Sequence, residues 1–332
     1  PDNENTAPSI KVEGLDLTDK PVTIFHGKMF TPKNLTPLKD LGGEGGKCTI
    51  WGDVFFSEVK GNFRKIYTVS ITDYQGSINL KIRAQEGEDC SKWESLGKGT
   101  TLIVRGDCSY DKYEHDYIVY PYDVLIVERK KREDNAPVKR VELHLHTKLS
   151  SMDGFCDPGG IVKLAHRMGH PAIAITDHGV MYGCIDFYSA MKDAGIKPII
   201  GCEVYVCRDR LDKSAANREY SHLILLCENN TGYQNLMKIV SKGFVDGYYY
   251  KPRVDMEVLQ EFHEGIIALS ACLAGEVPRF ILKGMKDEAR KAARKYEACF
   301  GKGNYFLELQ DHGMQEQQIV NQSLLRMAQE TG

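Results

Sequence analysis

The 332-residue chain lacks a long apolar segment, and no run approaches the roughly 18 residues that a membrane helix needs, so we expect no membrane partner. It also lacks an excess of one charge, with 43 Lys and Arg against 46 Asp and Glu. Any contact with nucleic acid therefore needs a local basic patch. Its ten cysteines include no Cys-x-x-Cys pair, and such scattered thiols are typical of a reduced, cytoplasmic protein.

The composition of the chain changes near residue 47. Residues 1–46 are polar with Pro and Gly punctuation, which indicates a linker or N-terminal extension with one short strand at Val22–His26. Five strands are predicted after it, at Cys48–Val54, Ile66–Thr72, Ile78–Ile82, Thr101–Gly106 and Tyr117–Val127. With a helix-like segment at Asp89–Leu96, this order predicts an all-β barrel of the OB type over residues 47–128. Residues 129–137 are expected to form a charged linker.

From residue 138 onward, predicted strands and helices alternate. The strands are expected at 141–146, 172–176, 198–206, 221–227, 265–270 and 304–309. The helices are expected at 158–168, 183–194, 230–241, 273–283, 286–300 and 315–330. This alternation predicts an α/β domain over 138–332 with a parallel sheet, here a barrel that lacks its last strands. Since the chain opens on Pro1 and ends at Gly332 directly after a predicted helix, we expect a fragment of a longer protein.

Two histidines on one predicted strand are the first sign of a metal site. In VELHLHT at 141–147, His144 and His146 are two residues apart, and the alternation of a strand puts both rings on one face. The run AIAI at 172–175 stops at Thr-Asp-His-Gly, as a buried parallel strand does when its carboxyl end delivers polar groups to a site. The alternative is that both histidines face solvent, and we favour it less because a second predicted strand also ends in an acid and a histidine.

Other polar residues gather at the predicted strand ends, namely Asp153, Asp177, His178, Glu203, Cys272, Asp311 and His312, while His222 begins its strand. Mixed His, Asp, Glu and Cys donors suit zinc or manganese, and two or three ions about 3.5–4 Å apart would suit hydrolysis of phosphate esters. Structural alternatives stay open for Glu203 as part of a buried pair, Cys272 as a small apolar residue and His312 as an exposed loop residue. For Asp177 we favour a cap of the following turn over a role as metal ligand.

Eight segments carry a family resemblance: HLHT at 144–147, SMDG at 151–154, ITDHG at 175–179, KPIIGCE at 197–203, YSHLILL at 220–226, YYKPRVD at 249–255, ALSACLAGE at 268–276 and LELQDHG at 307–313. Together they resemble the PHP (polymerase and histidinol phosphatase) domain of bacterial replicative DNA polymerase III alpha subunits. The resemblance implies a distorted (β/α)7 barrel with a multinuclear metal site. It implies as ligands His144, His146, Asp153, His178, Glu203, His222 and Cys272. The family's closing Asp-x-His motif has no counterpart, which implies a barrel truncated at its C-terminal end.

Two classes of alpha subunit contribute to the likeness. A barrel directly before the PHP-like part resembles the PolC type, whereas the sequence from about Gly179 onward resembles the uninterrupted DnaE-type PHP domain. The change falls around Ile173–Gly179, and both an unusual polymerase and two joined coding fragments are open interpretations.

The function implied by this resemblance belongs to a longer parent protein. The chain would be an N-terminal fragment of a DNA-directed DNA polymerase, a nucleotidyltransferase that uses magnesium. Its expected partners are single-stranded and primer-template DNA and replisome subunits such as the sliding clamp, in the cytoplasm. The fragment lacks the carboxylates for polymerisation. Two alternatives are a stand-alone metal-dependent phosphoesterase and a non-catalytic scaffold whose metals are structural clips.

Aromatic and basic residues of the predicted barrel suggest a nucleic-acid surface. The candidates are Phe55, Lys60, Phe63, Arg64, Lys65, Tyr67, Lys81 and Arg83. OB barrels bind single strands by stacking bases on rings beside basic side chains. Acidic neighbours such as Asp53 and Glu58 dilute the positive field, so binding should be weak and sensitive to salt. For each ring the alternative is packing in the core or at the rim.

Overall fold

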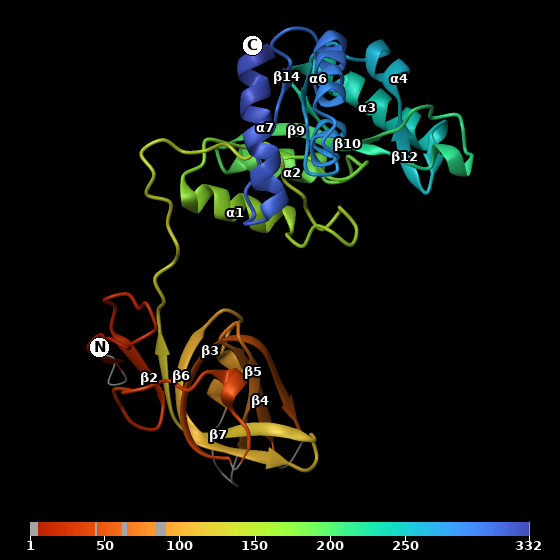
Figure 1. Ribbon diagram of the computed structural model, residues 1–332. Coiled ribbons are helices and arrows are strands. Elements are labelled where there is room, and N and C mark those ends of the chain that lie inside the picture. Colours follow the sequence, from red (N-terminus) through yellow and green to blue (C-terminus); the bar gives the residue numbers. More distant parts are fainter. Residues whose placement is uncertain (1–5, 44, 62–64, 84–90, 332) are drawn as a thin grey trace. The chain divides into compact units, whose positions relative to one another are not determined.

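The computed structural model describes residues 6–43, 45–61, 65–83 and 91–331 (Figure 1). The chain divides into two compact units, Pro1–Arg132 and Glu133–Gly332. No helix in these described ranges is long and apolar enough to span a membrane.

Five strands of the first unit close into a ring. They are β3 (Gly46–Lys60), β4 (Ile66–Thr72), β5 (Ser77–Arg83), β6 (Thr101–Asp111) and β7 (Asp116–Val127). β3 pairs with β4 and β4 with β5, β5 runs parallel to β7, and β6 joins β7 back to β3. The ring encloses an apolar core that includes Ile50, Leu80 and Val104, and Trp93 of the short helix η2 (Ser91–Ser95) packs into this core.

The segment before the barrel packs on the barrel as an N-terminal extension, and it contains the short strand that was expected at Val22–His26. β1 (Thr6–Ala7) pairs with β2 (Val22–His26), and β2 extends the sheet along β7. Apolar residues of this segment, such as Leu15 and Phe30, form a buried cluster with Ile103 and Leu125 of the barrel. The short helix η1 (Leu38–Asp40) buries Leu38 in the barrel core. Residues this widely spaced form no periodic pattern, which is why composition alone indicated a linker.

The sheet of the second unit is mixed, so the expectation of a parallel sheet was wrong. Its strands are β8 (Ala172–Ile175), β9 (Lys197–Val206), β10 (Ser221–Cys227), β11 (Tyr248–Tyr249), β12 (Lys251–Val254), β13 (Ile266–Leu269) and β14 (Tyr305–Phe306). The order is β11-β12-β9-β10-β13-β14, with β8 beside β9. β10 is antiparallel to both β9 and β13. β9 and β10 are joined by a loop with only the short helix η3 (Ala215–Asn217), and a connection without a crossover helix returns antiparallel.

The strand predicted at 141–146 is reduced to a single bridge between Glu142 and Ile173. The segment still runs beside β8, since Thr176 N–H donates to the Leu145 carbonyl at 2.9 Å. The Leu145 N–H, however, donates to the Thr176 hydroxyl at 2.8 Å and not to a backbone carbonyl. A side chain therefore takes the place of a ladder bond, and regular strand structure is lost.

The helices largely follow the predicted periodicity. They are α1 (Pro158–Met168), α2 (Cys184–Asp193), α3 (Asn230–Val245), α4 (Met256–Glu261), α5 (Glu276–Leu282), α6 (Lys286–Phe300) and α7 (Gln315–Thr331). Asp157 caps α1 by accepting from Gly159 N–H, and Pro158 occupies its first turn. α1 and α2 pack on β8, while α3, α4 and α6 cover the apolar side of β9, β10 and β13. Among these α-helices of the described residues, α4 was not predicted, because it is too short to show a period.

Candidate metal centre

Glu203 of β9 is the centre of a cluster of histidines. Its side chain is fully buried. Four rings face its carboxylate: His144 Nε2 and His146 Nε2 lie 2.9 and 2.8 Å from Oε2, His178 Nδ1 lies 3.4 Å from Oε2, and His222 Nδ1 lies 2.7 Å from Oε1. A buried carboxylate needs a compensating positive charge, which here comes from protonated rings or from a bound cation.

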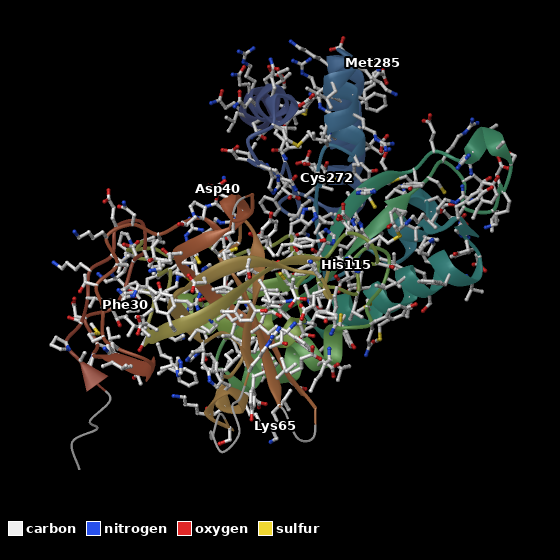
Figure 2. All side chains as sticks on the ribbon, turned by 90° about the horizontal axis from the view of Figure 1, so that it is seen from below. Phe30, Asp40, Lys65, His115, Cys272 and Met285 are labelled. Atoms are coloured by element: carbon white, nitrogen blue, oxygen red, sulfur yellow. The ribbon has the colours of Figure 1, made fainter. Side chains whose placement is uncertain are left out.

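The two remaining predicted ligands complete the rim. Asp153 Oδ2 lies 2.6 Å from His178 Nε2. Cys272, labelled in Figure 2, follows β13, and its sulfur lies 3.6 Å from His222 Nδ1 and 3.8 Å from Glu203 Oε1. All seven side chains predicted as ligands therefore converge. Three overlapping groups, His144–His146–Glu203, His146–Asp153–His178 and His178–Glu203–His222, each bring one donor atom per residue within 4.8 Å of the others.

The orientation of His146 is fixed by a hydrogen-bond chain. Ser150 Oγ donates its single hydrogen to Asp177 Oδ1 at 2.7 Å. The same oxygen lies 2.9 Å from His146 Nδ1 and so accepts a proton from that ring nitrogen. Nε2 of His146 is therefore the ring nitrogen that faces the cluster.

His144 is oriented in the same way by Glu308. Its Nδ1 lies 2.7 Å from Oε1 of Glu308, which as a carboxylate can only accept. Nε2 is left to face Nε2 of His146 at 3.0 Å. Two ring nitrogens this close, both directed at one carboxylate, require a cation between them, either a proton or a metal ion.

Two buried atoms beside Glu203 lack a hydrogen-bond partner within the described residues. Within the described residues, His178 Nδ1 and Glu308 Oε2 are buried and have no hydrogen-bond partner. Buried polar atoms normally have a partner, so these two are available to a ligand. Imidazole and carboxylate donors with one thiol suit zinc or manganese. The residues present therefore fit the group that the sequence predicted.

The electrostatics of the site favour positive charge beside Glu203. Burial lowers the pKa of His144, but hydrogen bonds to Glu203 and Glu308 outweigh it and raise that pKa to about 10. Burial raises the pKa of Glu203, yet the hydrogen bonds from His144, His146 and His222 hold it far below its usual range. Burial lowers the pKa of His178 and raises that of the Cys272 thiol to about 11. A proton on His144 thus supplies the charge that a metal ion would supply when bound.

Asp177, His312 and Asp311 lie outside the cluster of donors. Asp177 is buried and accepts from Thr147 N–H, Thr147 Oγ1 and Ser150 Oγ, so it caps the earlier turn at 147–150 and not the following turn that was expected. His312 is exposed, and its Nδ1 lies 2.8 Å from Gln317 Nε2. Asp311 accepts from Gly313 N–H. Asp311 and His312 line the cavity of about 1270 Å³ into which the cluster opens.

Sequence reasoning missed Glu308, Ser150 and Tyr205. Glu308 follows β14 and was recognisable as a strand-end carboxylate, but the more conspicuous pair at 311 and 312 drew the prediction instead. Ser150 carried no signal beyond its place in a polar loop. Tyr205 stacks on His178 with ring centres 5.8 Å apart, and its strand position two residues after Glu203 puts it on the same side of β9.

The predicted nucleic-acid residues of the barrel divide into available and unavailable ones. Tyr67 is only 3% exposed and belongs to the barrel core, so its predicted role was wrong. Lys81 is also buried, and Asp111 and Glu114 hold its ammonium at 3.0 and 2.5 Å, so the prediction for Lys81 was wrong too. A sequence cannot show that the β6–β7 hairpin carries two carboxylates onto β5.

The other barrel candidates remain accessible. Phe55 is 42% exposed. Lys60 pairs with Glu58, and Lys65, labelled in Figure 2, lies 3.6 Å from Glu94. Arg83 donates to Tyr120 Oη at 3.2 Å. Phe63 and Arg64 lie outside the described residues.

Comparison with known sequences identifies the family of the second unit. Residues 142–312 match the family described as the PHP domain. The chain belongs to the PHP domain family. The matched range contains all seven converging side chains, so the cluster around Glu203 lies wholly within the PHP domain.

Curated relatives of the PHP domain share one name. DNA polymerase III subunit alpha of Treponema pallidum (strain Nichols) is 48% identical over 191 residues, which are 57% of this chain and 16% of the relative. The subunit of the same name from Deinococcus radiodurans is 43% identical over 206 residues, covering 59% and 15%. The matched part of the chain thus spans less than a fifth of the length of these relatives.

A solved structure, an amidohydrolase from Chromobacterium violaceum with bound sulfate and no metal, is 24% identical to this chain. The match covers 31% of this chain and 34% of the amidohydrolase chain. Its TM-score is 0.23, which is too low to support an inference.

Proposed function

We propose that this chain is part of a DNA polymerase III alpha subunit and that its PHP domain binds two or three divalent ions, zinc or manganese. The names of the curated relatives support the first statement. The observation that carries the second is the convergence of four imidazoles on the buried carboxylate of Glu203. The proposed ligands are His144, His146, Asp153, His178, Glu203, His222 and Cys272, in a domain of the distorted (β/α)7 type.

The chemistry proposed for the site is hydrolysis of a phosphate ester. Ions bound in such a site polarise a phosphoryl oxygen and lower the pKa of water. The chain's own residues would orient the donors, because Glu308 and Ser150 hold the rings of His144 and His146 by their Nδ1 atoms. The cavity of about 1270 Å³ leaves room for a substrate beside them. The competing proposal is a scaffold in which the ions only stabilise the fold.

The wider role would be that of the parent subunit. Template-directed polymerisation with magnesium, partners such as primer-template DNA and a sliding clamp, and a cytoplasmic location all belong to this proposal. Their support is the shared name of the relatives and nothing in the site itself.

Elemental analysis and a phosphatase assay test the proposal together. The purified full chain should contain at least one bound ion, and His144→Ala combined with His146→Ala should remove at least one. His166→Ala, on the exposed side of α1, is a matched control that should keep the metal. Less than one ion per chain in the wild type would refute the metal site. Full metal content without hydrolysis of p-nitrophenyl phosphate would favour the scaffold.

We further propose that the barrel is of the OB type and binds single-stranded DNA weakly. The strand order β3-β4-β5-β7-β6 with its parallel β5–β7 pair supports this. Phe55 offers an exposed ring, and Lys60, Lys65 and Arg83 are exposed cationic side chains. The full chain should bind a single strand more tightly than a duplex, with affinity that falls as salt rises. Equal affinity for both forms would instead indicate a protein-contact or spacer domain.

A further inference from the structure

A second cavity, of about 820 Å³, lies beside the metal centre in the PHP domain. Its lining residues are Ala215, Arg218, Glu219, Tyr220, His222, Arg279, Leu282 and Lys283. His222 also lines the larger cavity, so the two spaces share this imidazole in their walls. Three cationic side chains against one carboxylate make the second cavity positive, whereas the cluster around Glu203 is rich in carboxylates.

The cations of this cavity are not neutralised by neighbours. Within the described residues, no carboxylate lies in ion-pair distance of Arg218, Arg279 or Lys283, although Glu219 shares the cavity wall. Arg279 Nη1 donates to the Tyr220 carbonyl at 2.6 Å, which anchors the guanidinium at the wall. Arg218 lies over the ring of Tyr250 at 4.9 Å. Two of the three cations are therefore positioned by contacts that leave their charge unpaired.

Aromatic rings connect this cavity with the metal centre. The ring of Tyr220 is parallel to that of His222, with 6.1 Å between centres. Tyr205, which stacks on His178, contacts Tyr220 edge-on at 5.0 Å. Lys251 lies over the Tyr205 ring at 5.3 Å and adds a further cation at this side. Aromatic rings and cationic side chains thus lie next to one another between His178 and Arg279, and proteins that bind single-stranded nucleic acid combine the same two kinds of side chain.

We propose that this cavity is a subsite for a backbone phosphate of a nucleic-acid strand whose neighbouring phosphate lies at the metal centre. The inference rests on the proposed function, since it assigns a second contact to the substrate of that site. A small phosphate monoester carries one phosphate group and cannot fill both cavities. A phosphodiester strand carries one charge per nucleotide and can place adjacent charges on the two sides of His222.

Binding of a labelled trinucleotide, measured by fluorescence anisotropy at several salt concentrations, tests the subsite. All variants and the wild type share the same barrel, so any binding of the strand by the barrel is an equal background in each measurement. Arg218→Ala with Lys283→Ala should weaken binding about tenfold at low salt, and the slope of log affinity against log salt should fall by about 0.7 for each lost phosphate contact. Both residues are exposed, so the fold should tolerate the change. Arg167→Ala, an exposed arginine on α1, is the control.

Two further readouts separate this inference from the proposed function. The metal content of the double variant and its KM for p-nitrophenyl phosphate should equal those of the control, because neither needs the second cavity. Unchanged trinucleotide affinity and salt slope would overturn the subsite, as would an equal loss in Arg167→Ala. If the wild type contains no metal and the double variant still binds the trinucleotide more weakly than the wild type does, the metal proposal is refuted and the anion site is retained.

Discussion

His144 Nδ1 lies 2.7 Å from Oε1 of Glu308, although the two residues are 164 positions apart in the chain. Gln310 Nε2 donates to the same carboxylate oxygen at 2.7 Å. The segment after β14 therefore determines how the first histidine of the cluster presents its Nε2 atom. Metal-binding histidines commonly donate their other ring N–H to such a carboxylate, which raises the basicity of the ligand.

Removing this carboxylate should weaken metal binding without removing a predicted ligand. Glu308→Ala should lower metal affinity about tenfold to hundredfold, because the ring of His144 loses its orientation. Glu308→Gln should lose less metal affinity than Glu308→Ala, since its amide oxygen still accepts a hydrogen bond from His144 Nδ1. Competition with a chelator of known affinity measures both. Equal affinity in Glu308→Ala and the wild type would show that His144 is held by other contacts.

Asp177 should be important for stability and only indirectly for metal. Its carboxylate is buried and accepts three hydrogen bonds from Thr147 and Ser150. Asp177→Ala leaves those donors without a partner and should lower the free energy of unfolding by about 2–4 kcal/mol. Urea unfolding followed by circular dichroism measures it, because the α-helices belong to the PHP unit. Asp177→Asn keeps one acceptor oxygen and should be less destabilised. A smaller loss of unfolding free energy in Asp177→Ala than in Asp177→Asn would contradict this role.

Strand-end reasoning selected side chains that converge around Glu203, because its signal is local. His144, His178 and Glu203 each stand within a few residues of an apolar run, and strands of one sheet bring such ends together. Glu308 obeys the same rule after β14, but that strand has only two residues and gives little pattern. Whether a residue lies at a strand end is visible in the sequence, whereas the partner of its side chain is not.

The failures have a different physical origin. The antiparallel pair β9–β10 depends on a loop that lacks a helix, and loop conformation leaves no periodic trace. Tyr67 and Lys81 lie on strands that were predicted at nearly the right positions, yet their availability depends on what covers each face. For Lys81 the answer comes from Asp111 and Glu114, about thirty residues later in the chain.

Acid should weaken the barrel through Asp111. Hydrogen bonds from Lys81 and from the N–H groups of Tyr113 and Glu114 lower the pKa of this carboxyl to about 2. Since its pKa in the unfolded chain is about 3.9, the stabilisation is complete above that pH and is lost as pH falls toward 2. The wild type should therefore lose more stability between pH 5 and pH 2 than Asp111→Asn does. Tryptophan fluorescence reports on this unit alone, because the two tryptophans of the chain, Trp51 and Trp93, both lie in it. Parallel pH profiles of the two proteins would show that other carboxyls cause the acid sensitivity.

Gly154 should be required for the position of Asp153 at the metal centre. A Cβ atom at Gly154 would lie 1.8 Å from the carbonyl oxygen of Thr147, so one of the two backbones has to move. Thr147 is fully buried and bound twice to Asp177, which leaves the exposed loop with Asp153 as the part that shifts. Gly154→Ala should therefore separate Asp153 from His178 and lower the metal content by one ion, while the fluorescence-detected stability of the barrel stays unchanged. Gly160→Ala is the matched control, because its Cβ in α1 meets nothing within 4 Å and should be neutral or stabilising by about 1 kcal/mol. Full metal content in Gly154→Ala would mean that Asp153 is not a ligand or that Thr147 yields instead, and a structure of that variant distinguishes the two.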